Sequence, residues 1–431
     1  MPGRRTATLV VLVVLLLSGC GTVRTAESAG ADSRQLATSP GPLSPASDPF
    51  YRWSGSLAHA APGAVLRTRR VRVTQAGSAS PVEVTQLLYV TTDEQGRRTV
   101  SVATVLQPIS SEASATHLVS YQEPYDGLGS QCDPSYTLQL LALHETSAVP
   151  VPLQFTADGD TVVTADYEGE DLAYGAGQQS GYETLDAIRA AEHWLGRPER
   201  STPVGMVGYS GGSIATDFAA ELVPSYAPQL DIVGVAEGGV PVDLFHNIAY
   251  VDNPGSKWNW VIPALFEGVA RGFGLHDLNQ YLTAKGIAAV NADRNQCAGG
   301  FVGLTTAQFL KPRYRDLEKV PAFVRIIDHL IMSRTGTPRG PLLIGVGSSN
   351  ATGDGVMVTQ DVRELAYTYC TRGTPVEFHV YDGLSHTEAG LAFFEQAELF
   401  ISQRFGNVPI QNGCAGIGPG NSIAPIPIPQ G

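Results

Sequence analysis

The sequence predicts an α/β fold in which helices flank a mostly parallel sheet and a helical segment is inserted late in the chain. Two observations lead to this prediction. Short apolar runs alternate with helical patterns over residues 82–242, which is typical of parallel sheets. The alternation then stops, and residues 243–339 carry helical patterns without a clear strand. Apolar runs return at about residue 340, so one sheet with an inserted helical cap accounts for the pattern.

The first strands are expected at Val82 to Thr92 and Thr99 to Leu106, which flank a turn at residues 93–97. Later strands are expected as buried apolar runs at residues 116–121, 161–166, 204–207, 232–236, 341–347 and 376–381. Helices are expected where apolar residues recur at helical spacing, at residues 181–195, 214–222, 356–371 and 388–404.

These patterns divide the chain into parts. Residues 49–242 and 340–415 are predicted to form the core, and residues 243–339 the cap. Residues 416–431 are rich in Gly, Pro and Ile without a pattern, so we predict a disordered tail. Several aromatic residues of the cap are candidates to line an apolar site, although simple packing explains each one at least as well: Phe245, Trp258, Trp260, Phe266 and Phe273.

The beginning of the chain is an export signal. Arg4 and Arg5 precede an apolar run from Leu9 to Leu17, which is short for a membrane span. The run ends in Leu17-Ser18-Gly19-Cys20, which resembles a bacterial lipobox, so residues 1–20 are predicted to be a lipoprotein signal peptide with lipidation at Cys20. The alternative is an ordinary secretory signal that is discarded together with Cys20. We therefore expect a lipoprotein on the outer face of the cell membrane, or a secreted protein.

Residues 21–48 are rich in Ser, Ala, Pro and Gly and are predicted to be a flexible tether. The formal net charge is -13, and no basic run follows the first few residues. This charge distribution disfavours nucleic acid as a partner.

Four further cysteines are available for pairing. An exported protein with Cys132, Cys297, Cys370 and Cys414 is expected to form two disulfides, with three possible pairings. Free buried cysteines are the alternative, which export disfavours. There is no C-x-x-C motif, so the sequence indicates no metal site.

The clearest chemical motif is Gly208-Tyr209-Ser210-Gly211-Gly212, which matches G-x-S-x-G. An apolar run precedes it and a helical pattern follows it, which is the context of a nucleophile elbow. The glycines allow the strand and the helix to approach closely and tolerate a strained backbone at the turn. Ser210 is therefore the candidate nucleophile.

A serine nucleophile needs a histidine as base. His386 follows the last predicted strand, at the position where a base would meet the elbow, and is the favoured candidate. His379 lies inside that strand and is expected to be structural. His246, His276 and His329 fall in the predicted cap.

The histidine in turn needs a carboxylate, which should follow the preceding strand. Asp354 is the first carboxylate after the strand at residues 341–347 and is the favoured acid. Asp361 would lie on the following helix, and Asp382 is the main rival because it is close to His386 in sequence.

An oxyanion hole needs two N–H donors. One is expected to be the backbone N–H of Gly211, directly after the nucleophile. The other should come from the loop after the third strand, where Asp126 or Gly127 can donate, and spacing alone does not choose between them.

Taken together, these motifs resemble the secretory lipases related to fungal lipase A, a group also found in actinobacteria. The resemblance covers roughly residues 49–414. It depends on the order and spacing of six segments: Tyr121-Gln122-Glu123-Pro124-Tyr125-Asp126, Asp166-Tyr167-Glu168-Gly169, Gly208-Tyr209-Ser210-Gly211-Gly212, Glu237-Gly238-Gly239-Val240-Pro241, Gly353-Asp354 and Ser385-His386-Thr387.

The resemblance implies an α/β-hydrolase core with a helical cap that shelters an acyl-binding tunnel. It also implies a triad of Ser210, Asp354 and His386, with Asp126 and Gly211 as the oxyanion donors. One departure is that the acid stands in Gly353-Asp354-Gly355, where the family often has Pro-Asp-Glu. The cap is the least similar region, so the substrate range does not follow from the resemblance.

The resemblance further implies the disulfides Cys132–Cys297 and Cys370–Cys414. The first would tie the oxyanion loop to the cap, and the second would fix the end of the chain. The lipobox and the long tether are not general features of the family.

The expected function is that of an exported serine hydrolase that cleaves triacylglycerol or other lipid esters through an acyl-serine. No cofactor or metal is expected, and we expect a monomer attached to the membrane through Cys20. The alternatives are an acyltransferase or serine peptidase on the same fold, or a non-catalytic surface lipoprotein that binds lipid.

Overall fold

The computed structural model describes residues 41–71, 74–75, 78–79, 82–109, 117–140, 151–197 and 200–430. The predicted signal peptide, Cys20 and most of the predicted tether lie outside the described residues. Within these ranges, no helix has the length and apolar character that a membrane crossing requires.

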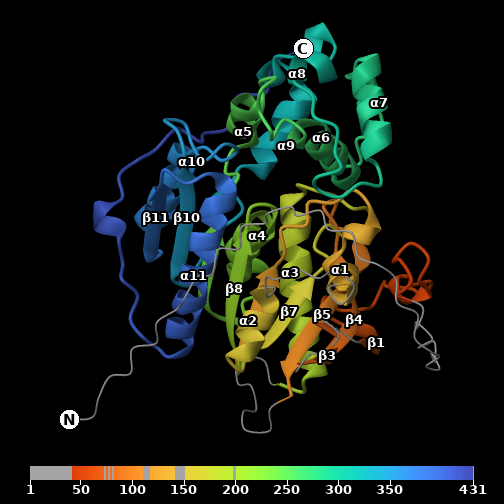
Figure 1. Cartoon of the computed structure of the whole chain (residues 1–431), viewed down its shortest axis with the longest axis vertical. Coiled ribbons are helices and arrows are strands. Elements are labelled where there is room, and N and C mark those ends of the chain that lie inside the picture. The colour runs from red at the N-terminus through yellow and green to blue at the C-terminus, as the bar shows by residue number, and fades with distance from the viewer. Residues whose placement is uncertain are drawn as a thin grey trace, which may run out of the picture. The chain divides into compact units, whose positions relative to one another are not determined.

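The core is a nine-stranded sheet with the order β1-β4-β5-β7-β6-β8-β9-β10-β11 (Figure 1). Strands β1, β4, β5 and β7 pair in antiparallel fashion, and the pairs from β7 to β11 are parallel. The strands are β1 (Val65–Val71), β4 (Val82–Thr92), β5 (Arg98–Pro108), β6 (Leu118–Gln122), β7 (Thr161–Ala165), β8 (Pro203–Tyr209), β9 (Asp231–Gly238), β10 (Leu342–Ser348) and β11 (Val376–Asp382). A separate two-stranded hairpin consists of β2 (Thr74–Gln75) and β3 (Ser78–Ala79).

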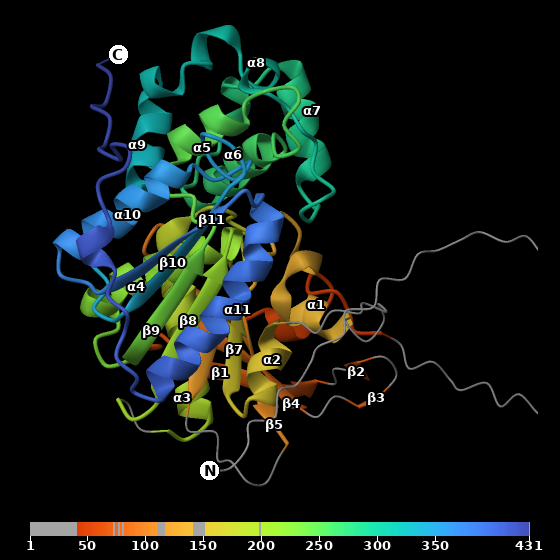
Figure 2. The same cartoon turned by 60° about the vertical axis from the view of Figure 1, so that its left-hand side comes forward.

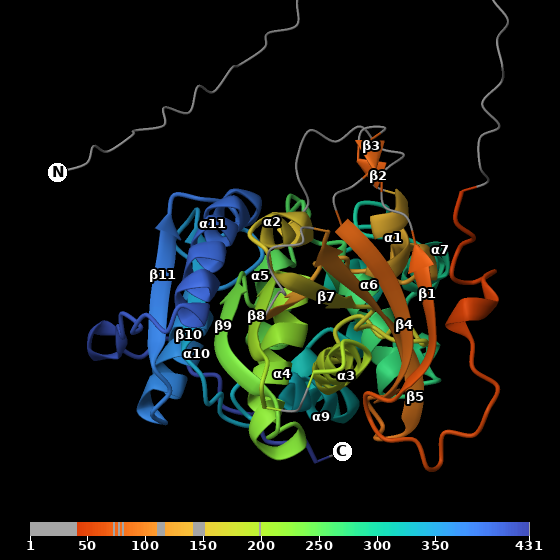
Figure 3. The ribbon, with the colours of Figure 1, turned by 90° about the horizontal axis from the view of Figure 1, so that it is seen from below.

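Helices cover both faces of the sheet, as the sequence predicts (Figure 3). One apolar cluster joins α3 (Gly177–Trp194), α4 (Gly211–Tyr226) and α10 (Thr359–Thr371) to one face. A second cluster joins α2 (Val151–Ala157) and α11 (His386–Phe405) to the other face. Alternate residues of a strand point to opposite faces, and accordingly Met206 of β8 belongs to the first cluster and Val207 to the second. A further helix is α1 (Pro134–Leu140).

The predicted helical cap lies between β9 and β10, above one end of the sheet (Figures 1 and 2). Its helices are α5 (Leu244–Val251), α6 (Val261–Gly272), α7 (Ala284–Asp293), α8 (Thr306–Phe309) and α9 (Pro321–Leu330). The apolar cluster of the first sheet face continues into these helices, so the core and the cap share one apolar interior. Short 3-10 helices occur at Pro49–Tyr51, Ser130–Cys132, Leu278–Gln280, Pro312–Tyr314, Leu317–Lys319 and Cys414–Gly416.

The prediction of a disordered tail over residues 416–431 is wrong for residues 416–430, which the structure describes. Ile417 and Ile423 are buried. The Gly420 N–H donates to Glu364 Oε2 at 2.8 Å, and Asn421 Nδ2 donates to Asp361 Oδ1 at 2.7 Å. The acceptors belong to α10, which is distant in sequence, so the local pattern of the tail does not reveal them.

Candidate active site

Ser210 lies at the sharp turn between β8 and α4. Its backbone has φ 54° and ψ −125°, a sparsely populated conformation for a residue with a side chain. The turn is tight enough to require its glycines: a Cβ at Gly208 would lie 2.2 Å from Thr216 Oγ1, and one at Gly212 would lie 2.1 Å from Gln122 O. The strained turn presents the serine hydroxyl at the end of the sheet that faces the cap.

His386 meets this hydroxyl from the other end of the sequence. It is the first residue of α11, and its ring is buried. Its Nε2 lies 2.8 Å from Ser210 Oγ, and its Nδ1 lies 2.8 Å from Asp354 Oδ2. The Tyr209 hydroxyl donates to the His386 carbonyl at 2.6 Å, and the Trp258 ring packs edge-on against the imidazole at 5.2 Å between centroids. The imidazole therefore joins the serine to one carboxylate in a fixed orientation.

Asp354 follows β10 and is buried. Its second oxygen, Oδ1, accepts hydrogen bonds from the Val356 N–H at 3.0 Å and the Met357 N–H at 2.7 Å. These bonds hold the carboxylate toward His386. The rival Asp382 is exposed, and Asp361 binds His246 instead, at 3.0 Å. The structure thus brings Asp354, of the three candidates, to His386.

The other histidines considered in the sequence lie elsewhere. His379 is on β11 and lies 3.0 Å from Glu377 Oε1. His246 and His329 are on the cap helices α5 and α9, and His276 lies between α6 and α7.

The two oxyanion candidates in the loop after β6, Asp126 and Gly127, differ in whether the backbone N–H already has a hydrogen-bond acceptor. The Gly127 N–H points to Glu168, with distances of 3.3 and 3.2 Å to its two oxygens. Among the described residues, the N–H of Asp126 has no hydrogen-bond acceptor. Gly211 is the first residue of α4, and N–H groups in the first turn of a helix have no partner within the helix. The geometry therefore favours Asp126 together with Gly211 over Gly127.

The Asp126 side chain forms part of the same site. A Cβ at Gly211 would lie only 1.7 Å from Asp126 Oδ1, so the carboxyl group rests directly on that glycine. Burial raises the pKa of Asp126 to about 6, and the proximity of His386 opposes this shift. The sequence motif indicates the backbone role of this residue, but it contains no sign of the carboxyl contact with Gly211.

An apolar cavity adjoins Ser210 beneath the cap. It is lined by Asp126 and Gly211 on the core side and by Trp258 and Trp260 on the cap side. A second apolar cavity lies among α5, α6 and α9. The two cavities share three lining residues: Leu244, Ile248 and Leu265.

Of the five aromatic candidates of the cap, Trp258 and Trp260 line the first cavity and Phe266 lines the second. Phe245 and Phe273 line neither and pack in the apolar interior. The aliphatic lining residues look like ordinary core positions in the sequence, which gives no signal that distinguishes them.

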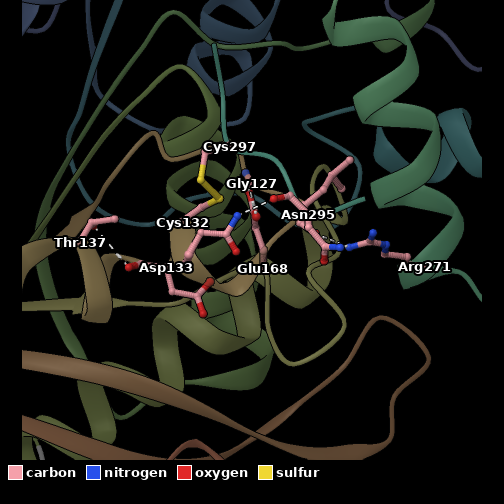
Figure 4. The surroundings of a disulfide bond; sticks show 10 residues. Gly127, Cys132, Asp133, Thr137, Glu168, Arg271, Asn295 and Cys297 are labelled. Carbon is pink, nitrogen blue, oxygen red and sulfur yellow. Dashed lines mark hydrogen bonds between the residues drawn. A yellow bond between two sulfur atoms is a disulfide. The ribbon is translucent and has the colours of Figure 1, made fainter. Parts of the chain in front are cut away.

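The part of the chain that the structure describes contains two disulfides. Cys132 is joined to Cys297, and Cys370 to Cys414, each with a Cα–Cα distance of 5.5 Å. The first links the segment after the loop that contains Asp126 to the cap (Figure 4). The second links α10 to the segment that follows α11.

The mostly parallel sheet, the serine elbow that follows β8 and the inserted helical cap define an α/β-hydrolase. A family model described as secretory lipase matches residues 143–413. The chain therefore belongs to the secretory lipase family, and it is an exported lipase or carboxylic ester hydrolase.

Individual relatives and a solved structure agree with the family assignment. A probable inactive lipase of Mycobacterium tuberculosis is 33% identical over 357 residues, covering 78% of this chain and 77% of the relative. Lipase A of Arthroderma benhamiae is 30% identical over 396 residues, covering 86% and 82%. The structure of Candida antarctica lipase A in its closed state superposes with a TM-score of 0.76 at 26% identity and covers 91% of each chain.

Proposed function

We propose that this protein hydrolyses lipid esters through an acyl-enzyme on Ser210. The observation that supports this most strongly is the position of His386, whose two ring nitrogens lie 2.8 Å from Ser210 Oγ and 2.8 Å from Asp354 Oδ2. Along the chain the nucleophile comes first, the acid second and the base third, which is the order found in α/β-hydrolases. A non-catalytic lipid-binding role would give no reason for this arrangement.

In the proposed reaction, Ser210 Oγ attacks the ester carbonyl while His386 Nε2 accepts the serine proton. Asp354 holds the Nδ1 proton and stabilises the imidazolium that forms. The N–H groups of Gly211 and Asp126 hydrogen-bond to the oxyanion of the tetrahedral intermediate. His386 then donates its proton to the leaving alcohol, and a water molecule activated by the same histidine releases the fatty acid and restores Ser210.

The two adjoining cavities support a substrate with an apolar acyl chain, such as a triacylglycerol or another lipid ester. Ser210 lines the first cavity, and three cap residues that line it also line the second cavity. Because burial of each methylene group is favourable by about 0.8 kcal/mol, a chain that extends into the second cavity gains more binding energy than one that ends in the first.

A series of p-nitrophenyl esters from butyrate to palmitate tests this assignment. We expect wild-type protein to hydrolyse the long-chain esters well and Ile248→Phe to lower kcat/KM for them by about tenfold or more, because Ile248 lines both cavities and the larger ring would fill space where they adjoin. The short-chain esters should be hydrolysed at nearly the wild-type rate. Val302→Phe is the control, since Val302 is an exposed residue of the cap. An equal reduction for all chain lengths in Ile248→Phe would contradict the proposed path of the acyl chain.

We further propose that lipidation of Cys20 attaches the mature chain to the outer face of the cell membrane, with the part of the predicted tether before Ser44 as the link. The prediction of a flexible tether is wrong for residues 44–48, which form a turn in which Asp48 is buried and pairs with Arg69. The Leu17-Ser18-Gly19-Cys20 segment supports this proposal. When the protein is expressed with an alkyne fatty acid, we expect label on the wild-type protein in the membrane fraction, and neither label nor membrane attachment for Cys20→Ala. A mature wild-type chain that begins at another residue and carries no lipid would contradict it.

A further inference from the structure

Arg271, on the cap helix α6, connects the cap to the loop that contains Asp126. Its Nη1 donates to the Leu128 carbonyl at 3.0 Å, and its Nη2 donates to the Arg294 carbonyl at 3.1 Å. Its Nε donates to Glu267 Oε1 at 3.1 Å, which orients the guanidinium group from within α6. One side chain therefore holds a core loop and two parts of the cap together.

The cap also binds the backbone N–H of Leu128, which donates to the Gln296 carbonyl at 2.9 Å. Gly127 forms an isolated β-bridge with Cys297, and a Cβ on Gly127 would lie 2.6 Å from the Cys132 Cβ. The loop after Asp126 is thus fixed by hydrogen bonds and by close packing against the Cys132–Cys297 disulfide.

These anchors matter because Asp126 itself has an unfavourable backbone conformation. Its φ is 44°, in the left-handed region that residues with side chains seldom adopt. Such a conformation is unfavourable and persists only when the flanking structure imposes it. On the preceding side, the Tyr125 hydroxyl accepts a hydrogen bond from the Glu168 N–H at 2.8 Å. On the following side, Leu128 is the anchored residue, and Arg271 holds its carbonyl.

We propose that Arg271 is a positioning residue of the oxyanion hole, which fixes the direction of the Asp126 N–H by holding Leu128 against the cap. This inference rests on the proposed function. Arg271 is not among the described residues that line the Ser210 cavity, so it acts through the loop and not by contact with the substrate. The oxyanion forms only as the reaction proceeds, so a misdirected N–H weakens binding of the transition state and leaves substrate binding nearly unchanged.

The test compares Arg271→Met and Arg271→Lys with wild-type full-length protein, using one p-nitrophenyl ester. We expect kcat of Arg271→Met to fall about tenfold or more while KM changes less than about twofold. Arg271→Lys keeps a cationic donor and should recover part of the lost kcat. Arg315→Met is the matched control, because Arg315 is a cap arginine that donates to the cap carbonyls of Leu310 and Ala307. It should keep the wild-type kcat.

A second measurement separates positioning from a general structural defect. A boronic acid that adds to Ser210 imitates the tetrahedral intermediate, whereas the product fatty acid occupies only the acyl site. Arg271→Met should lose boronate affinity by roughly the factor lost in kcat and keep its affinity for the fatty acid. Unchanged kcat, or equal losses for boronate and fatty acid, would overturn the proposal. If wild-type protein failed to react at Ser210 at all, the proposed function itself would fail, and that result is recognised without any Arg271 variant.

Discussion

Ser210→Ala is expected to lower kcat for ester hydrolysis by about 10⁴- to 10⁶-fold, because the variant has no hydroxyl with which to form the acyl-enzyme. The unfolding temperature should stay close to that of wild-type protein, since Ser210 Oγ contacts only His386 among the hydrogen bonds of the described residues. Initial rates with a p-nitrophenyl ester and thermal unfolding measure the two quantities.

Ser180→Ala is the matched control for this variant. Ser180 is a buried serine on α3, and its hydroxyl bonds the Ala176 carbonyl at 2.9 Å. It should keep nearly the full rate. A Ser210→Ala protein that hydrolyses the ester within tenfold of the wild-type rate would refute the assignment of the nucleophile.

Asp354→Asn is expected to cause a loss of about 10³- to 10⁴-fold in kcat with little change in KM. The amide cannot stabilise the imidazolium that forms during attack, and it favours the wrong tautomer of His386. The loss should become smaller at alkaline pH if hydroxide can replace the impaired base. A pH–rate profile over the stable range of both proteins measures it.

Asp382→Asn provides the comparison, because Asp382 was the rival acid in the sequence and the structure shows it exposed. We expect it to retain the wild-type rate. If Asp382→Asn lost more activity than Asp354→Asn, the acid of the triad would have to be reassigned.

The sheet and the reaction centre could be predicted because their signals are local. Buried strands appear as apolar runs, and the elbow at Ser210 needs glycines at fixed positions for steric reasons that the structure makes explicit. His386 could be chosen because the loop after the last strand of the sheet lies at the same edge as the elbow. The choice of Asp354 over Asp382 followed from strand order, and burial agrees with it.

Other features depend on contacts between distant residues and left no local signal. Strand β1 contains Arg67, Arg69 and Arg70 and does not read as a buried strand, yet it pairs with β4 at the edge of the sheet. The tail is held by acceptors on α10. Asp126 and Gly127 differ in the availability of their backbone N–H groups, because the Gly127 N–H points to the Glu168 carboxylate. The spacing of residues in the sequence does not reveal this contact.

Family membership by itself does not establish turnover, because the mycobacterial relative is described as a probable inactive lipase although a third of its aligned residues are identical to those of this chain. In the present chain, His386 lies within hydrogen-bonding distance of both Ser210 and Asp354, and an apolar cavity opens beside the serine. These features are the basis for expecting turnover here.

The most direct test of the central claim is reaction with a fluorophosphonate followed by mass mapping of the labelled peptide. The account predicts one modified residue, Ser210, and a much slower reaction in His386→Ala, because the hydroxyl then lacks its base. Labelling of a different serine, or equally fast labelling of Ser210 without His386, would contradict it.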